Sequence, residues 1–190
     1  AIEAGGWAAD AVQALWRQLE ATGLADALLG EKQGGAGLAL SQVFGVLEQC
    51  GAHALALPLG ETLLARALLA QAGVARPAGA IALARGERLA DGGLRCALVS
   101  AGRVAGSVLV QAGDGWHLLA VGGAQAAPQA LALDAALGWS PAQLLAAPVV
   151  AVAQDLDMRT LQAAVLAADG RSPDAGVPAH PAVRQRAPAV

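Results

Sequence analysis

The sequence predicts an α+β fold in which helices come first and a small antiparallel β-sheet or barrel follows. Two observations support this order: up to residue 76 the apolar residues recur with helical spacing, and from residue 77 they form short runs separated by glycine turns. A third observation concerns the whole chain of 190 residues, of which 56% are hydrophobic and 14% charged. This composition excludes disorder across the whole chain.

The first two helices are predicted from apolar stripes and from the residues that end them. The first helix ends near Gly23, and its stripe at i, i+3, i+4 and i+7 is formed by Val12, Leu15, Trp16 and Leu19. A glycine-rich break follows at residues 30–37. The second helix has Ser41 as its N-cap and stops at Gly51, with a stripe formed by Val43, Val46, Leu47 and Cys50.

A third helix is predicted from about residue 61 to Gly73, after Pro58 and Gly60. It is apolar on nearly every side except at Arg66 and Gln71. A helix of this kind has no solvent face, so we expect it to lie buried among other elements.

The strand-rich part is predicted from short apolar runs about ten residues apart. These runs cover residues 80–84, 94–99, 104–110, 117–121, 130–133 and 148–152. Turn signals such as Asp91-Gly92-Gly93 and Gly113-Asp114-Gly115 separate them, which favours a small antiparallel sheet or barrel. A last helix is expected at residues 158–168 with Asp157 as its N-cap. Beyond Asp169 the composition shifts to Gly, Pro, Ser, Arg and His, which is typical of a segment without a packed element.

Charge and composition argue against several classes of function. The net charge is −3 and the pI is about 5.5, whereas nucleic-acid binding needs a dense basic face. The longest uncharged run, residues 135–154, is interrupted by Pro141 and Pro148, so we predict no membrane span and a cytoplasmic protein. Two cysteines without a CxxC spacing predict neither a disulfide scaffold nor a zinc site.

The residues alone predict no catalytic constellation and no metal site. No histidine is spaced from a second ligand residue as a metal site requires, and no pair of carboxylates has a fixed acid/base spacing. Structural or solvent-exposed roles are therefore predicted for His53, His117, His180, Cys50, Cys96, Glu31 and Glu48. The loop Gly34-Gly35-Ala36-Gly37 lacks the pattern of a nucleotide-binding loop and by itself indicates only that the backbone needs freedom or close approach there.

Several motifs in a fixed order carry a family resemblance. They are Gly23-Leu24, then Glu31-Lys32-Gln33-Gly34-Gly35-Ala36-Gly37, then Glu48-Gln49-Cys50-Gly51, and finally Pro58-Leu59-Gly60-Glu61-Thr62. In this order they resemble the N-terminal helical domain of the acyl-CoA dehydrogenase family, with Gly30 at the usual proline position. The resemblance implies the domain bounds 1–76 for the helical domain, 77–155 for a middle β-barrel domain and 156–168 for the start of a C-terminal helical bundle, with 169–190 as an irregular tail.

The middle domain departs from the family pattern at one strand. The family's flavin-facing strand usually carries a hydroxyl that hydrogen-bonds the isoalloxazine, and the matching residues here are Ile81-Ala82-Leu83-Ala84. The C-terminal bundle, which supplies most flavin contacts and the glutamate base, is expected to be cut short. When the codons of the tail are read one nucleotide later, they permit the sequence of the family's missing helix, so we expect a frameshift near residues 167–169. An ordinary disordered tail is the alternative.

The resemblance implies an FAD-dependent enzyme that dehydrogenates an acyl-CoA thioester between Cα and Cβ and passes electrons to electron-transfer flavoprotein. It also implies a homo- or hetero-oligomer, and it places Gly34, Gly35 and Gly37 beside the acyl-chain pocket. This chain offers no catalytic base, so we expect little or no turnover from it alone. Two alternatives remain open: a non-catalytic subunit of a heteromeric acyl-CoA dehydrogenase, and a structural remnant without activity.

Overall fold

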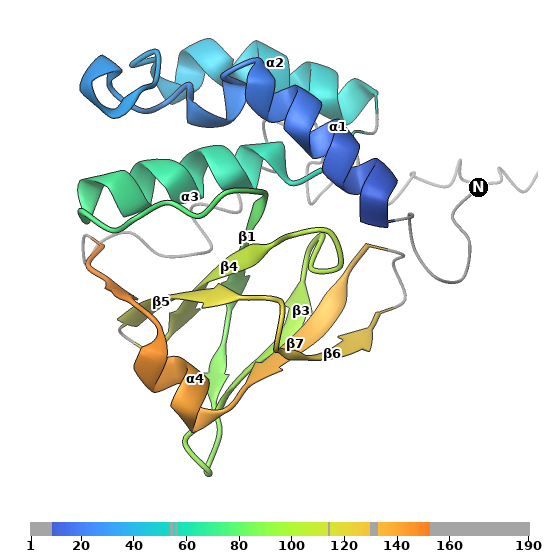
Figure 1. Cartoon of the computed structure of the whole chain (residues 1–190), viewed down its shortest axis with the longest axis vertical. Helices are drawn as coiled ribbons and strands as arrows, with labels where there is room; N and C mark the ends of the chain where they lie inside the picture. Colours follow the sequence, from blue (N-terminus) through green and yellow to red (C-terminus); the bar gives the residue numbers. More distant parts are fainter. Residues whose placement is uncertain (1–8, 54, 56, 114, 130–132, 153–190) are drawn as a thin grey trace, which may run out of the picture.

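The computed structural model describes residues 9–53, 55, 57–113, 115–129 and 133–152. Its helices, in chain order, are α1 (Ala9–Ala21), the short 3-10 turns η1 (Leu24–Asp26) and η2 (Glu31–Gln33), α2 (Leu40–Ala52), α3 (Leu59–Gln71) and α4 (Pro141–Ala146). Its strands are β1 (Ile81–Arg85), β2 (Glu87–Arg88), β3 (Leu94–Val99), β4 (Ser107–Ala112), β5 (Gly115–Ala120), β6 (Gln125–Pro128), β7 (Ala135–Trp139) and β8 (Val149–Val150). The predicted α+β class, with helices before strands, is confirmed (Figure 1).

Within the described residues the strands form two four-stranded sheets and no closed barrel, so the predicted barrel was wrong in this respect. The first sheet has the order β1-β4-β5-β8 and the second the order β2-β3-β7-β6. The chain passes between the sheets at Gly86, where an added Cβ would lie 2.7 Å from Val110 Cγ1 and 2.8 Å from Leu94 Cδ1. Because β2 and β3 lie in the second sheet, β4 returns beside β1 in parallel, which an antiparallel meander would not allow.

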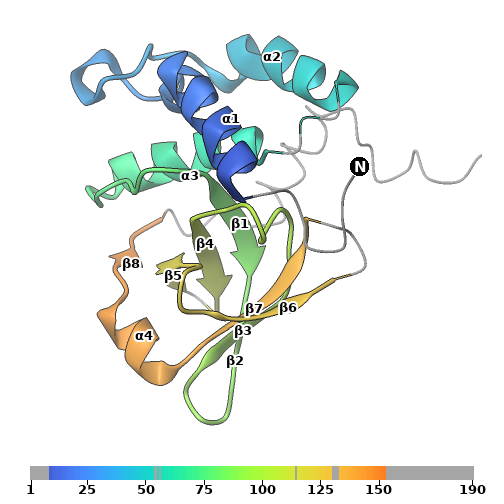
Figure 2. The same cartoon turned by 45° about the vertical axis from the view of Figure 1, so that its right-hand side comes forward.

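The first sheet lies between α3 on one face and the second sheet on the other (Figure 2). Strand β1 shows this alternation, since Ile81 and Leu83 pack toward α3 while Ala82 and Ala84 face the second sheet. All four side chains are fully buried. Helix α3 also packs against the outer helices, which confirms that it is buried among other elements.

The outer helical layer is formed by α1 and α2, as their predicted stripes require. Val12 and Trp16 of α1 are buried together with Val43 and Leu47 of α2. The cap of α2 differs from the prediction: the helix begins at Leu40, and the Gln42 side-chain oxygen accepts from the Ala39 N–H at 2.8 Å. Ser41 therefore lies inside the helix and is not its N-cap.

Helix α4 was not predicted, although its sequence carries a start signal. Ser140 is its N-cap and accepts from the Gln143 N–H, Gln143 reaches back to the Ser140 N–H, and Pro141 occupies the first turn. The apolar run around these residues hid this capping box, because it resembles a buried strand or a broken apolar segment.

The observed strand boundaries differ most from the predicted ones between residues 100 and 135. The run predicted at 104–110 becomes β4 from Ser107 onward, because residues 100–104 form a turn with Ala101 at φ +53°. The buried Asp134 carboxylate accepts from the Ala101 N–H at 3.0 Å and holds this turn. Of the run predicted at 130–133, residues 130–132 lie outside the described residues, and β6 and β7 lie on either side of it. The predicted helix 158–168 and the tail from residue 169 also lie outside the described residues.

Candidate functional site

A buried arginine joins the helical elements that resemble the family. Arg66 of α3 is 5% exposed; its Nη1 donates to Asp26 Oδ2 at 2.9 Å, and its Nη2 donates to the Glu20 carboxylate and to the Gly79 carbonyl. Burial by itself raises the pKa of Glu20, but the hydrogen bonds from Arg66 and the Gly79 N–H outweigh it and lower that pKa. A single side chain thus ties α1, η1 and α3 to the segment that enters β1.

The Pro58-x-x-Glu61-Thr62 motif closes the free edge of β1. Glu61 Oε2 accepts from the Leu83 N–H at 2.7 Å, and Thr62 Oγ1 accepts from the Ile81 N–H at 3.0 Å. The Thr62 hydroxyl in turn donates to the Pro58 carbonyl at 2.7 Å. Because β1 is an edge strand, these side chains take the amide donors that a neighbouring strand would otherwise bind. The structure therefore gives this motif a structural role, joining the helical layer to the first sheet.

Replacing Thr62 with valine should destabilise the fold by about 1.5 kcal/mol, since the isosteric side chain leaves the buried Ile81 N–H without an acceptor. Urea denaturation followed by circular dichroism measures this loss. Thr62→Ser keeps the hydroxyl and serves as the matched control, with a smaller loss expected. Equal losses in the two variants would assign the effect to packing and contradict the hydrogen-bonding role.

The three glycines predicted beside the acyl pocket lie in one compact loop, in two different environments. Gly34 and Gly37 are exposed at φ +86° and φ +64°, where most side chains would be strained. Gly35 instead lies against the preceding turn, and an added Cβ would lie 2.2 Å from the Asp26 carbonyl oxygen and 2.3 Å from that of Leu29. The Gly37 N–H donates to the Leu29 carbonyl at 2.6 Å, so the loop folds back onto η1.

The strand that the resemblance assigns to the flavin does not fit that cofactor. Its residues at 81–84 carry no hydroxyl. Each side chain is fully buried, either against α3 or against the second sheet. The outward amides of Ile81 and Leu83 are occupied by Thr62 and Glu61. Neither a side chain nor an outward amide of this strand is available to an isoalloxazine ring.

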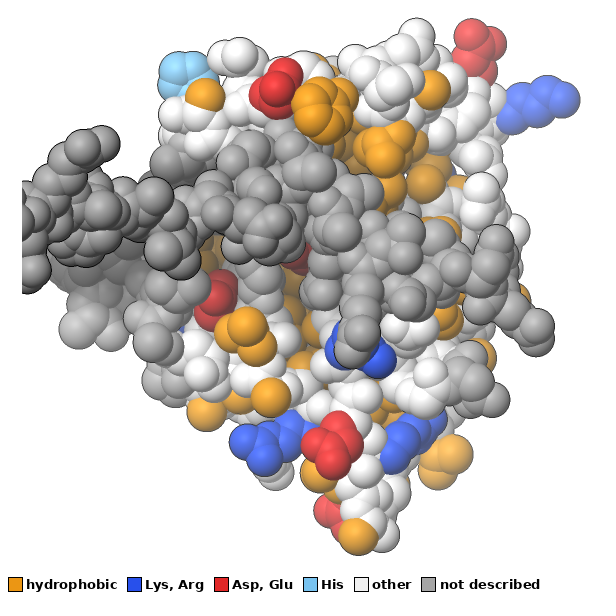
Figure 3. All heavy atoms as spheres, turned by 180° about the vertical axis from the view of Figure 1, so that it is seen from behind, with side chains coloured by type: hydrophobic (Ala, Val, Ile, Leu, Met, Phe, Trp, Pro, Cys, Tyr) orange, Lys and Arg blue, Asp and Glu red, His pale blue; other side chains and the backbone are white. Residues whose placement is uncertain are grey.

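An open groove of about 280 Å³ lies just beyond this strand, lined by Arg85, Gly86, Glu87, Arg95 and Ala97. Glu87 faces Arg95 in the register of β2 and β3, and the two arginines make the groove weakly basic. Seen from behind, basic and acidic side chains lie side by side at the end of the molecule that carries the β2–β3 turn (Figure 3). Sequence reasoning missed this groove, because residues from three strands meet there only after the chain crosses between the sheets.

Three of the remaining candidates lie within the described residues, in the core or at the end of α2. Cys96 is buried in β3, where burial raises the pKa of its thiol to about 12, and Cys50 packs at the end of α2. His53 is exposed at the C-cap of α2, and His180 lies outside the described residues. Within the described part of the chain no group of His, Cys, Asp or Glu could hold a metal ion, and no helix is long and apolar enough to cross a membrane.

Comparison with protein-family models and with curated proteins finds no match to this chain. Among solved structures it is similar to a variant of the Tcur3481-Tcur3483 steroid acyl-CoA dehydrogenase, with a TM-score of 0.62 and 23% sequence identity. The similarity covers 82% of this chain and 52% of that one, so the chain spans about half the length of the solved protein. Together with the motifs above, this similarity shows that the chain has the fold of part of an acyl-CoA dehydrogenase.

Proposed function

We propose that this chain is part of a flavin-dependent acyl-CoA dehydrogenase, an enzyme that oxidises the Cα–Cβ bond of an acyl-CoA thioester. The observation that carries the proposal is the structural similarity over 82% of the chain to an acyl-CoA dehydrogenase. The ordered motifs give independent support, because the Pro-x-x-Glu-Thr motif makes the contacts that join the helices to the first sheet. The loop of Gly34, Gly35 and Gly37 would form one wall of the acyl-chain pocket in this enzyme.

A second candidate function is that of a non-catalytic subunit in a mixed assembly. Two observations favour it. Residues 81–84 of β1, the stretch that the resemblance assigns to the flavin, offer it no side chain and no free outward amide, since the side chains are buried and the amides of Ile81 and Leu83 are occupied. The similar steroid enzyme has a name that joins two components, Tcur3481 and Tcur3483, which supports an assembly of unlike chains. In that arrangement the flavin and the carboxylate base would come from the other subunit.

Flavin retention tests these proposals. We expect the purified chain alone to show no flavin absorbance and no bleaching with straight-chain or steroid-type acyl-CoA, because β1 provides no flavin contact. Bleaching by acyl-CoA in the isolated chain would contradict the second candidate and support a self-sufficient dehydrogenase.

Co-expression with a complete dehydrogenase subunit separates the two candidates further. A stable complex that retains flavin, and that reduces electron-transfer flavoprotein when acyl-CoA is added, would support the role of a subunit. A chain that stays monomeric, with no flavin and no bound acyl-CoA, would contradict both candidates and leave the structural remnant.

A further inference from the structure

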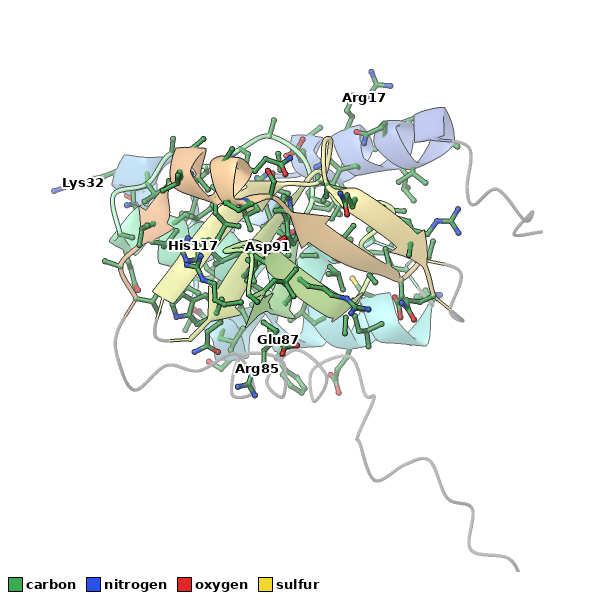
Figure 4. The ribbon with its side chains drawn as sticks, turned by 90° about the horizontal axis from the view of Figure 1, so that it is seen from below. Arg17, Lys32, Arg85, Glu87, Asp91 and His117 are labelled. Atoms are coloured by element: carbon green, nitrogen blue, oxygen red, sulfur yellow. The ribbon has the colours of Figure 1, made fainter. Side chains whose placement is uncertain are left out.

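One hydrogen bond between side chains links the two sheets at the end that carries the groove. His117 of β5 lies in the first sheet, Arg88 of β2 lies in the second, and Arg88 Nη2 is 2.9 Å from His117 Nε2. Figure 4 shows Arg85 and Glu87 together at one margin of the ribbon, with His117 apart from them. Arg88 thus reaches inward to the first sheet while its neighbour Glu87 lines the groove.

The geometry requires a neutral His117. An arginine can only donate, so Nε2 must accept and the ring proton must sit on Nδ1. The ring is 7% exposed, and its Nδ1 is buried without a partner in the described part of the chain. Burial, followed by the charge of Arg88, lowers the pKa of His117 below its ordinary value of 6.5. His117 faces Val110 of β4 and Val149 of β8 in the sheet register, so Arg88 is the charged group that acts on it.

Protonation would remove this link. With a proton on both ring nitrogens, Nε2 can no longer accept, and two cations would face each other at 2.9 Å in a partly buried position. Arg88 is exposed and can swing into solvent, whereas the ring of His117 is held inside β5. Beside this link, β2 is held by its short pairing with β3 at Glu87 and Arg88 and by the hydrogen bond from the Gly86 N–H to the Gln111 carbonyl of β4 at 2.8 Å.

We propose that the His117–Arg88 hydrogen bond is an acid-sensitive link between the two sheets, and that protonation of His117 releases the Arg88 side chain from the first sheet and so loosens the pairing of β2 with β3 and the turn at residues 89–93 that this pairing closes. The direction follows from linkage. The folded state binds a proton at His117 less readily than the unfolded state, so the stability that the link contributes is fully present above about pH 6.5 and is lost as the pH falls through the lowered pKa of His117. The groove lined by Glu87 and Arg95 would then change shape with pH.

Hydrogen exchange of the full chain tests the proposal. We compare the protection of the amides that close the β2–β3 turn, Leu89 and Gly92, with that of α3 amides, at about pH 7 and about pH 5 after correction for the intrinsic rates. In the wild type, protection at the turn should fall by about tenfold at the lower pH, while α3 should stay protected.

His117→Gln is the matched control, because its amide oxygen can accept from Arg88 but does not titrate. The proposal predicts that turn protection in His117→Gln is the same at both pH values, and an equal fall in both proteins would overturn it. NMR of the wild-type ring nitrogens decides the matter if that variant does not fold. Protonation of His117 in step with loss of turn protection supports the link, and protonation without that loss overturns it.

Discussion

Replacing Arg66 with alanine should lower the free energy of unfolding by about 3 kcal/mol, because it breaks a buried ion pair. The variant removes the donor shared by Glu20, Asp26 and the Gly79 carbonyl and leaves a cavity beneath α3. The two carboxylates keep 28% and 33% of their side-chain surface exposed. Because water can partly solvate them, the loss should lie at the lower end of the range for breaking a buried ion pair. The shift of the urea midpoint measures it.

The same network predicts a pH dependence. The pKa of Glu20 is lowered below its ordinary value of 4.5, so the ionised carboxylate contributes stability above that pH and loses it as the pH falls through the lowered pKa. In the Arg66→Ala variant this contribution should disappear, so the free energy of unfolding should fall less steeply at acid pH than it does in the wild type. The same fall at acid pH in both proteins would show that the lowered pKa of Glu20 does not depend on Arg66.

Arg17→Ala on α1 is the matched control for the charge. Its side chain is exposed and, within the described residues, donates to the Gln13 carbonyl of its own helix and to no other group, so the change in unfolding free energy should stay within about 0.5 kcal/mol. A loss as large as that of Arg66→Ala would mean that net charge, and not the buried network, sets the stability.

Replacing Gly35 with alanine should cost at least about 3 kcal/mol or force the loop to move. An added methyl group would lie 2.2 Å and 2.3 Å from the carbonyl oxygens of Asp26 and Leu29 and 2.6 Å from Leu29 Cβ. Two of these three atoms belong to the backbone and the third is bonded directly to it, so no side-chain rotation relieves the clash. Thermal or urea unfolding measures the loss. Loss of acyl-CoA binding by the assembled enzyme would add support for the proposed pocket wall.

Gly45→Ala makes the same chemical change, but its effect on stability should have the opposite sign. Gly45 lies on the exposed face of α2, and nothing lies within 4 Å of an added Cβ. Alanine should therefore stabilise the protein by about 1 kcal/mol through helix propensity. If Gly35→Ala proved as harmless as Gly45→Ala, the close approach of the loop to η1 would not exist in solution.

The helices could be predicted because their information is local. Val12 and Trp16 recur with the helical period, and a glycine follows the ends of α1 and α3 and lies in the last turn of α2, so α1, α2 and α3 were found within a few residues. Strand positions were predicted less well where the pattern was not local. The turn at Ala101 is held by Asp134, which lies far along the chain, and no neighbouring residue signals it.

The sequence by itself determined the class of the fold, the three helices that precede the strands and the motif series that points to an acyl-CoA dehydrogenase. The tertiary structure alone decided that β1 pairs in parallel with β4, that the strands divide into two sheets, and that Arg66 and His117 each join separate elements. The apolar periodicity of the sequence indicates which face of a helix or strand is buried, but it does not indicate which other element packs against that face. Partners of a buried charge come from distant parts of the chain, so they are known only once the chain is folded.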